Sequence, residues 1–226
     1  MPAKALPATG DIPHKSCDAS GMAEIHRMYK HGFKEAPALV TGVKSGDLEH
    51  AKVVATQLDL LSVSLHAHHE GEDQRLWGAL ESRAPSCAVD VDRMKSHHAS
   101  LAVELKKLDA ALPLWRASAK PSDAKPLIEA IEGINRALGI HLPDEEKNIV
   151  PVMETVITQP EVDWFSKHGQ KSTPKGQGWN ALGAIISSQP DPDAWLRKHL
   201  PPPVRLIWKW VGSKKYAQTR AALEGK

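Results

Sequence analysis

Apolar residues recur every three or four positions through long stretches of the chain, and this spacing limits the possible folds more than any other feature. In its clearest stretch the series reads Val54, Leu58, Leu61, Leu65, His68, Glu72 and Leu76. Steps of three and four place side chains on one face of an α-helix. The alternation typical of β-strands is nearly absent, and Ala, Leu, Glu and Lys dominate the composition. The sequence therefore predicts an all-α protein.

Gly, Pro and Ser clusters divide the chain into four long helices and a tail. The predicted helices cover about residues 20–43, 47–82, 85–118 and 120–158. Long helices joined by short loops predict an up-down-up-down four-helix bundle with a C-terminal helical extension. The expected organisation is an N-terminal arm, the bundle, and a basic, tryptophan-rich helical extension, at residues 1–18, 19–158 and 159–226.

The net charge and the cysteine content exclude several classes of protein. A formal net charge of +2 gives no reason to expect nucleic-acid binding. Cys17 and Cys87 lie far apart and form neither a CxxC motif nor a disulfide framework, which suits a reduced compartment. We see no apolar leader and no stretch of the roughly 18 apolar residues that a membrane span requires. We therefore expect a cytoplasmic protein that binds no nucleic acid.

Polar groups interrupt the apolar stripe of all four predicted helices. Each stripe carries a histidine, and two also carry a glutamate four residues later; the six residues are His26, His68, Glu72, His98, His141 and Glu145. A lone histidine on such a face is more often a hydrogen-bonded core residue than a ligand. Six such groups need another explanation, because buried carboxylates are costly unless they are paired or bind metal.

The six groups also fall at one depth of the predicted bundle. His26 and His68 each lie about 30 Å from the loop that joins their helices, and the pairs Glu72/His98 and His98/His141 match in the same way. In addition, "HHEGEDQRLW" (68–77) and "HLPDEEKNIV" (141–150) align without gaps. Two facing HxxxE helices can supply bridging carboxylates and terminal imidazoles to a pair of metals. Imidazole and carboxylate ligands without thiolate suit iron or manganese, with zinc as an alternative.

At these residues the chain resembles the hemerythrin-like family, the HHE cation-binding domain, over about residues 20–158. Its length and basic tail resemble a bacterial long form of that family. The resemblance implies a four-helix bundle around two oxo- or hydroxo-bridged iron ions. It also implies terminal ligands at His26, His68, His98 and His141, and bridging ligands at Glu72 and Glu145.

The third helix departs from the pattern of the oxygen-carrying members of the family. Those members have a second histidine one turn from the first, whereas the residues four away from His98 are Met94 and Ala102. His69 lies near the buried stripe and is the first candidate to fill the gap. Weaker candidates, as ligands or as hydrogen-bond partners of ligands, are Asp73 and Glu146.

The function expected from this site is chemistry on a small oxidant. A carboxylate-rich, open metal site favours turnover, so we expect the site to bind and react with O2, H2O2 or NO. Catalase-like, NO-reducing and O2-using activities all remain open, and no catalytic residue beyond the metal ligands and no organic cofactor is expected. Reversible O2 binding or oxygen or iron sensing is the alternative, and a purely structural metal is a third possibility.

Two further expectations concern a proline and the tail. Pro143 should kink or bulge the fourth helix beside the site. The tail has eight Lys or Arg against one acid from residue 197 onwards, so peripheral contact with an anionic membrane is one interpretation. We favour packing on the bundle, because helical spacing places four tail residues on one face: Val204, Ile207, Trp208 and Val211.

Overall fold

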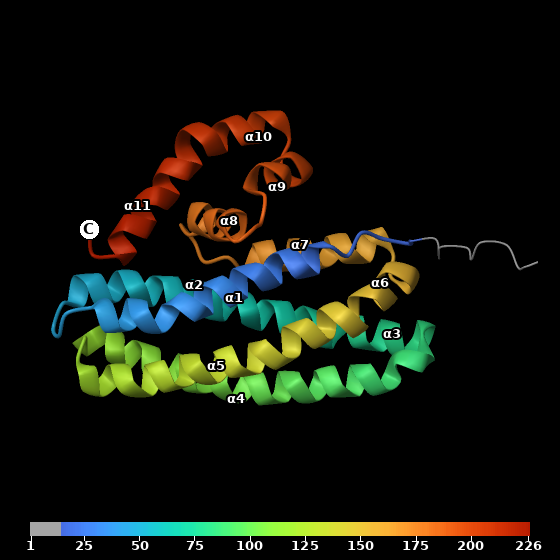
Figure 1. Cartoon of the computed structure of the whole chain (residues 1–226), viewed down its shortest axis with the longest axis horizontal. Coiled ribbons are helices and arrows are strands. Elements are labelled where there is room, and N and C mark those ends of the chain that lie inside the picture. The colour runs from blue at the N-terminus through green and yellow to red at the C-terminus, as the bar shows by residue number, and fades with distance from the viewer. Residues whose placement is uncertain (1–14) are drawn as a thin grey trace, which may run out of the picture.

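Four long helical segments form an antiparallel bundle in the computed structural model, which describes residues 15–226 (Figure 1). The long helices are α1 (Gly21–Gly42), α2 (Leu48–Gly71), α4 (Ala88–Ser118) and α5 (Pro121–Asn148). Two of them are extended, α2 by η1 (Glu72–Leu76) and α3 (Trp77–Arg83), and α5 by α6 (Val150–Val156). A short 3-10 turn, η2 (Pro85–Cys87), precedes α4. The predicted all-α helical bundle is confirmed; residues 1–14 of the expected N-terminal arm lie outside the described residues.

The helix ends follow from local sequence. Asp47 caps α2, because its carboxylate accepts a hydrogen bond from the backbone N–H of His50 at 3.0 Å. Gly46 precedes it at a φ of 82°, a conformation that glycine adopts without steric cost. Ala119 ends α4 in the left-handed region with a φ of 50°, and Pro121 then begins α5 at a position where its missing N–H is harmless.

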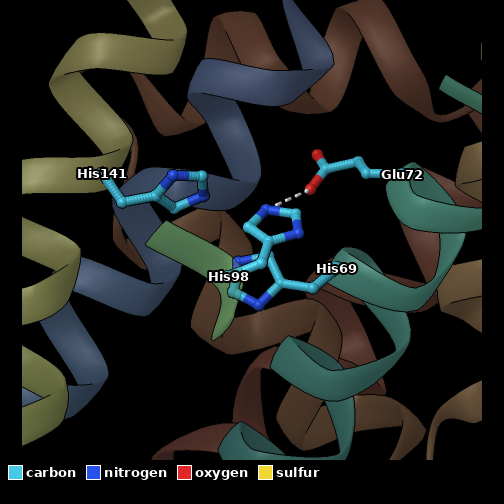
Figure 2. A group of neighbouring side chains, drawn as sticks. All are labelled: His69, Glu72, His98 and His141. Atoms are coloured by element: carbon cyan, nitrogen blue, oxygen red, sulfur yellow. Dashed lines mark ion pairs between the residues drawn. The ribbon is translucent and has the colours of Figure 1, made fainter. Parts of the chain in front are cut away.

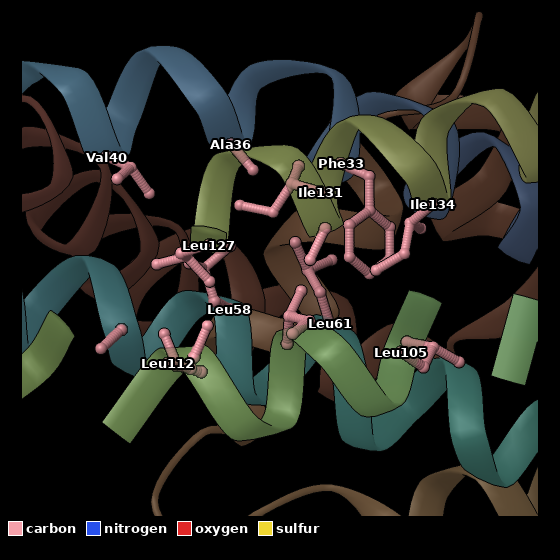
Figure 3. Close-up of a cluster of buried hydrophobic side chains, with 14 of the residues drawn as sticks. Phe33, Ala36, Val40, Leu58, Leu61, Leu105, Leu112, Leu127, Ile131 and Ile134 are labelled. Carbon is pink, nitrogen blue, oxygen red and sulfur yellow. The ribbon is translucent and has the colours of Figure 1, made fainter. Parts of the chain in front are cut away.

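A polar layer divides the apolar core of the bundle into two clusters. Figure 3 shows part of the larger one, in which side chains from all four long helices point into the shared interior. On α4, His98 lies between Leu101 of the larger cluster and Met94 of the smaller. The same order holds on α2, where Leu65 and Leu76 lie on either side of the polar residues. Apolar side chains therefore close the layer off along the bundle axis at both ends.

The helix interruptions near this layer differ from the prediction. Of the kink or bulge predicted at Pro143, the bulge is not found, because α5 continues as an α-helix through Pro143 and is interrupted only at Ile149, two residues before Pro151. Pro143 has no N–H to donate to the carbonyl of Gly139. The helix tolerates this because both residues are exposed, so water can bind that carbonyl. A bulge is found instead in the other HxxxE helix. There η1, which begins at Glu72, is a π-helical turn and so contains one residue more than an α-helical turn. Such turns are frequent at functional sites.

The C-terminal segment folds back along the bundle (Figure 1). It contains α7 (Gln159–Ser172), α8 (Gly178–Ser187), α9 (Pro192–His199), α10 (Pro202–Ile207), the π-helical turn η3 (Trp208–Gly212) and α11 (Ser213–Leu223). α7 and the end of α11 contact α2, and α8 contacts α1. Polar contacts fix this arrangement, since the side-chain amide of Asn180 donates to Gln57 at 2.7 Å in a buried position and the ring of His50 donates to the carbonyl of Leu223 at 2.9 Å.

The predicted packing face of the tail is only partly correct. Trp208 is buried, but Ile207 and Val211 are 49% and 42% exposed. The inner face is centred instead on Trp208 and Gly212, because the close approach to α8 is made at glycine: a Cβ on Gly212 would lie 2.6 Å from the ring of Trp179. Helical spacing alone marks where large apolar residues fall and cannot show that a glycine makes the contact. Within the described residues, no helix is long and apolar enough to cross a membrane.

Candidate metal centre

Seven side chains from the bundle helices converge in the polar layer. The first group is His69, Glu72, His98 and His141, and the second is His26, His68 and Glu145. Within each group, one ring nitrogen or carboxylate oxygen per residue lies within 4.8 Å of those of the others. Figure 2 shows the first group, which draws residues from three of the four bundle segments. The structure thus brings together all six residues singled out in the sequence, and His69 joins them.

The two glutamates lie between the groups. The carboxylate of Glu72 is 3.3 Å from Nε2 of His68 in the second group and 3.4 Å from Nε2 of His98 in the first, each through a different oxygen. Oε2 of Glu145 is 3.3 Å from Nε2 of His26 and 3.6 Å from Nε2 of His141. Each carboxylate therefore reaches one imidazole of each group. This is the arrangement that two bridging ligands between two cations require.

Many polar atoms of the layer are buried without a hydrogen-bond partner among the described residues. They are both carboxylate oxygens of Glu72 and of Glu145, Nε2 of His69 and of His98, and both ring nitrogens of His141. Unpaired buried polar atoms are rare because each carries a desolvation cost of about 1–3 kcal/mol, more for charged groups. The donor set, imidazole and carboxylate together, fits a divalent or trivalent cation of the first transition row.

Asp73 orients the imidazole of His98 from outside the layer. Nδ1 of His98 donates to Oδ1 of Asp73 at 2.7 Å, so the tautomer that results leaves Nε2 free to face the layer. Nε1 of Trp77 donates to the same oxygen at 2.7 Å and holds the carboxylate in place. The sequence left Asp73 open as a ligand or as a partner of a ligand, and the structure places it against His98. Its link to Trp77 was missed, although the two residues are four apart on a helix.

Glu146 has the equivalent position beside His26. Its Oε1 accepts from Nδ1 of His26 at 3.0 Å and from Nζ of Lys30 at 3.0 Å. Asp73 and Glu146 each directly follow one of the two central glutamates, so the repeat noticed in the sequence extends to the residues that orient the ligands. Carboxylate–histidine pairs of this kind also make the imidazole a stronger base and a better ligand.

The electrostatics of the layer keep most of its imidazoles neutral. Burial, together with the neighbouring imidazoles, lowers the pKa of His68 and of His69 well below the usual value and lowers that of His141 to about 4. For His26 the close contact with the Glu145 carboxylate and the hydrogen bond to Glu146 outweigh burial and raise its pKa. Neutral imidazole is the form that binds metal, so His68, His69 and His141 need no deprotonation to accept a cation near neutral pH.

The two central carboxylates affect each other strongly. Burial and the nearby charge of Glu145 raise the pKa of Glu72 well above its usual range. Burial acts the same way on Glu145, but the close contact with His26 at 3.3 Å and the surrounding imidazoles outweigh it and lower its pKa. Two charged carboxylates in one dry layer repel each other, and a bound cation removes that repulsion.

The remaining nearby residues surround the layer. His66 is exposed and pairs with Asp109 on α4 at 2.9 Å, away from the two groups. The ring of His97 lies 5.9 Å from that of His141 but outside both groups. Tyr29 packs its ring 5.4 Å from His68 and donates its hydroxyl to the carbonyl of Ser64 at 3.0 Å.

The fold and the layer together define a helical-bundle protein with a buried site for metal cations. The family model of the hemerythrin HHE cation-binding domain matches residues 19–153. The chain therefore belongs to the hemerythrin HHE family, as its motifs predicted, and it carries a metal-cation-binding site. No curated protein and no solved structure matches the chain significantly.

Proposed function

We propose that the layer binds two iron ions and that a small oxidant, O2, H2O2 or NO, binds and reacts there. The observation that carries the proposal is the contact of Glu72 and Glu145 with imidazoles of both groups. His69, His98 and His141 would hold one ion and His26 and His68 the other, and both glutamates would serve the two ions together. Iron so held supplies Lewis acidity and changes of oxidation state.

The two groups differ in their number of imidazoles, and this difference indicates which group the small ligand binds beside. The second group offers two imidazoles where the first offers three, so an ion held there would have more room for a further ligand. It also contains His68, whose side chain is 11% exposed. We therefore propose that O2, H2O2 or NO binds at the ion held by His26 and His68. The apolar clusters above and below the layer keep bulk water away from that position.

Metal analysis together with the near-ultraviolet spectrum tests the metal assignment. We expect two irons per chain and the absorption bands of a bridged ferric pair. One metal per chain, or zinc in its place, would contradict the di-iron proposal, while manganese in both positions would keep the dinuclear site and change its ions.

Reversible O2 binding is a second candidate, and His69 favours it. The sequence argument for turnover relied partly on the missing second histidine of the third helix, but His69 brings the layer to five imidazoles. Iron-loaded protein separates the two candidates. Sustained O2 evolution from H2O2, or consumption of NO over many turnovers, supports the enzyme, whereas a stable oxygenated spectrum that reverses under vacuum supports the carrier or sensor.

A further inference from the structure

The outer face of the C-terminal segment exposes four large apolar side chains within six residues. Leu206, Ile207, Trp210 and Val211, together called the apolar ridge below, are 58%, 49%, 65% and 42% exposed. Single exposed apolar residues are ordinary, but a contiguous group marks a surface that another structure covers. The other exposed large apolar side chains of the described chain are scattered over α2, α4 and α5.

The ridge cannot turn inward, because the opposite face of the same segment is already packed. Trp208 is buried, and Gly212 lies so close to Trp179 of α8 that a Cβ would approach the ring to 2.6 Å. One turn later, Tyr216 covers Gly183 of α8 in the same way. The orientation of the segment is therefore fixed, with the apolar ridge on the side away from the bundle.

Unpaired positive charge surrounds the ridge. Residues 194–223 contain no Asp or Glu. Other cations of the tail have partners, Lys198 with Asp18 and Glu24, and Arg220 with Glu35. Four cations near the ridge have no ion-pair partner among the described residues: Arg205, Lys209, Lys214 and Lys215.

The position of the ridge suits contact with a flat surface. α10 and the beginning of α11 form the edge of the molecule farthest from α4 (Figure 1). The ridge belongs to this edge, since its four residues lie in α10 and in η3, which connects α10 to α11.

We propose that the apolar ridge docks on an anionic lipid surface. In this arrangement Leu206, Ile207 and Trp210 enter the boundary between head groups and acyl chains, and Lys209 and its neighbouring cations contact the lipid phosphates. Exposed Trp and Leu beside unpaired Lys and Arg, with no acid among them, match the chemistry of that interface. A second copy of the chain is a poorer occupant, because a two-fold contact would bring the same four cations of each copy together.

Co-sedimentation of the full-length, metal-loaded protein with vesicles tests the proposal. Vesicles of phosphatidylcholine containing phosphatidylglycerol should bind the protein more tightly than phosphatidylcholine alone, and added salt should weaken the binding. Ile207→Ser with Trp210→Ser should reduce binding by at least about tenfold, since both side chains lose apolar area that the lipid buries. Lys209→Gln and Lys214→Gln should each reduce it about fivefold on the anionic vesicles only.

The control is Leu114→Ser, which removes an equally exposed leucine from α4. It should leave vesicle binding unchanged, and all variants should keep the wild-type helix content because every altered side chain is exposed. Wild-type protein that fails to bind anionic vesicles, or that loses binding equally with Leu114→Ser, overturns the proposal. Sedimentation velocity measures the oligomeric state as a second test. If the wild type is a dimer and the double variant Ile207→Ser with Trp210→Ser is a monomer, the ridge is a contact between two copies and lipid docking is overturned.

Discussion

At the scale of single residues, His69 decides how many imidazoles the layer offers. It occupies the first group, while the neighbouring His66 is exposed and bonded to Asp109. We predict that His69→Asn leaves about one iron per chain after desalting and abolishes the spectrum of the bridged pair, because one ion loses a third of its imidazole ligands. The matched control His66→Asn should keep two irons. Two irons and an unchanged spectrum in His69→Asn would make His69 a packed neighbour of the site.

Asp73 gives a residue-scale prediction about orientation. It accepts from Nδ1 of His98, and Asp73→Asn weakens that hydrogen bond without changing the size of the side chain. We predict that the affinity for iron falls about 10- to 100-fold while two ions still bind at saturation. Competition with a chelator measures the affinity. Asp109→Asn is the control, since Asp109 forms the same kind of pair with His66 outside the layer; an equal loss there would indicate a general electrostatic effect.

At the scale of helices, the ion pair between Arg83 and Glu161 connects α3 to α7. The hydrogen bonds from Arg83 and from the backbone of Thr158 lower the pKa of Glu161 to about 2. A carboxylate whose pKa is lowered by folding stabilises the protein above its unfolded-state pKa, and this contribution is lost as the pH falls toward 2. We predict that Glu161→Gln lowers Tm by about 2–4 °C at pH 7, a small effect because the pair is partly exposed.

The pH dependence is the informative part of that measurement. The difference in Tm between wild type and Glu161→Gln should be constant from pH 7 to about 5 and should narrow as the pH falls below the ordinary glutamate pKa. Glu132→Gln, at an exposed carboxylate of α5, should change Tm little at any pH. A difference that stays constant down to the acid transition would show that Glu161 acts through its shape and not through its charge.

The same scale shows how far the sequence could predict the structure. Helix limits and the faces of His68, His98 and His141 could be predicted, because spacing and caps are local properties. The π-helical turn η1 could not be predicted, since no residue type in Glu72–Leu76 is specific to such a turn. Its additional residue is accommodated by the packing of the helices around the layer. His69 could only be ranked as a candidate, because adjacent residues on a helix lie about 100° apart and only the neighbouring helices decide which of the two also faces the interior.

The tail shows the opposite kind of limit. Its helical character and its contact with the bundle could be inferred from composition, and both are found. The buried face could not be inferred correctly, because Gly183 and Gly212 make the close approach to their neighbours and glycine has no place in a hydrophobic pattern.

At the scale of the whole molecule, the polar layer sets function against stability. Without a cation, Glu72 and Glu145 are buried close together, with no hydrogen bond to other described side chains for any of their four oxygens. We predict that Glu72→Gln makes the metal-free protein more stable by about 1–4 kcal/mol, because folding raises the pKa of Glu72 and so disfavours its charged form, whereas the amide carries no charge and has nearly the same volume. For a bundle of this size the gain corresponds to a rise in Tm of about 2–4 °C per kcal/mol.

The metal-loaded protein should respond in the opposite way. A cation present at about 1,000 times its dissociation constant adds about 4 kcal/mol to the stability of the wild type. Glu72→Gln should gain much less from iron, since a neutral amide is a poor bridge between two cations. Thermal unfolding with and without iron therefore gives a crossing pattern, with the variant more stable without metal and the wild type more stable with it. If the variant is less stable in both states, Glu72 serves mainly to hold the bundle together; if it gains as much from iron as the wild type does, Glu72 is not a bridging ligand.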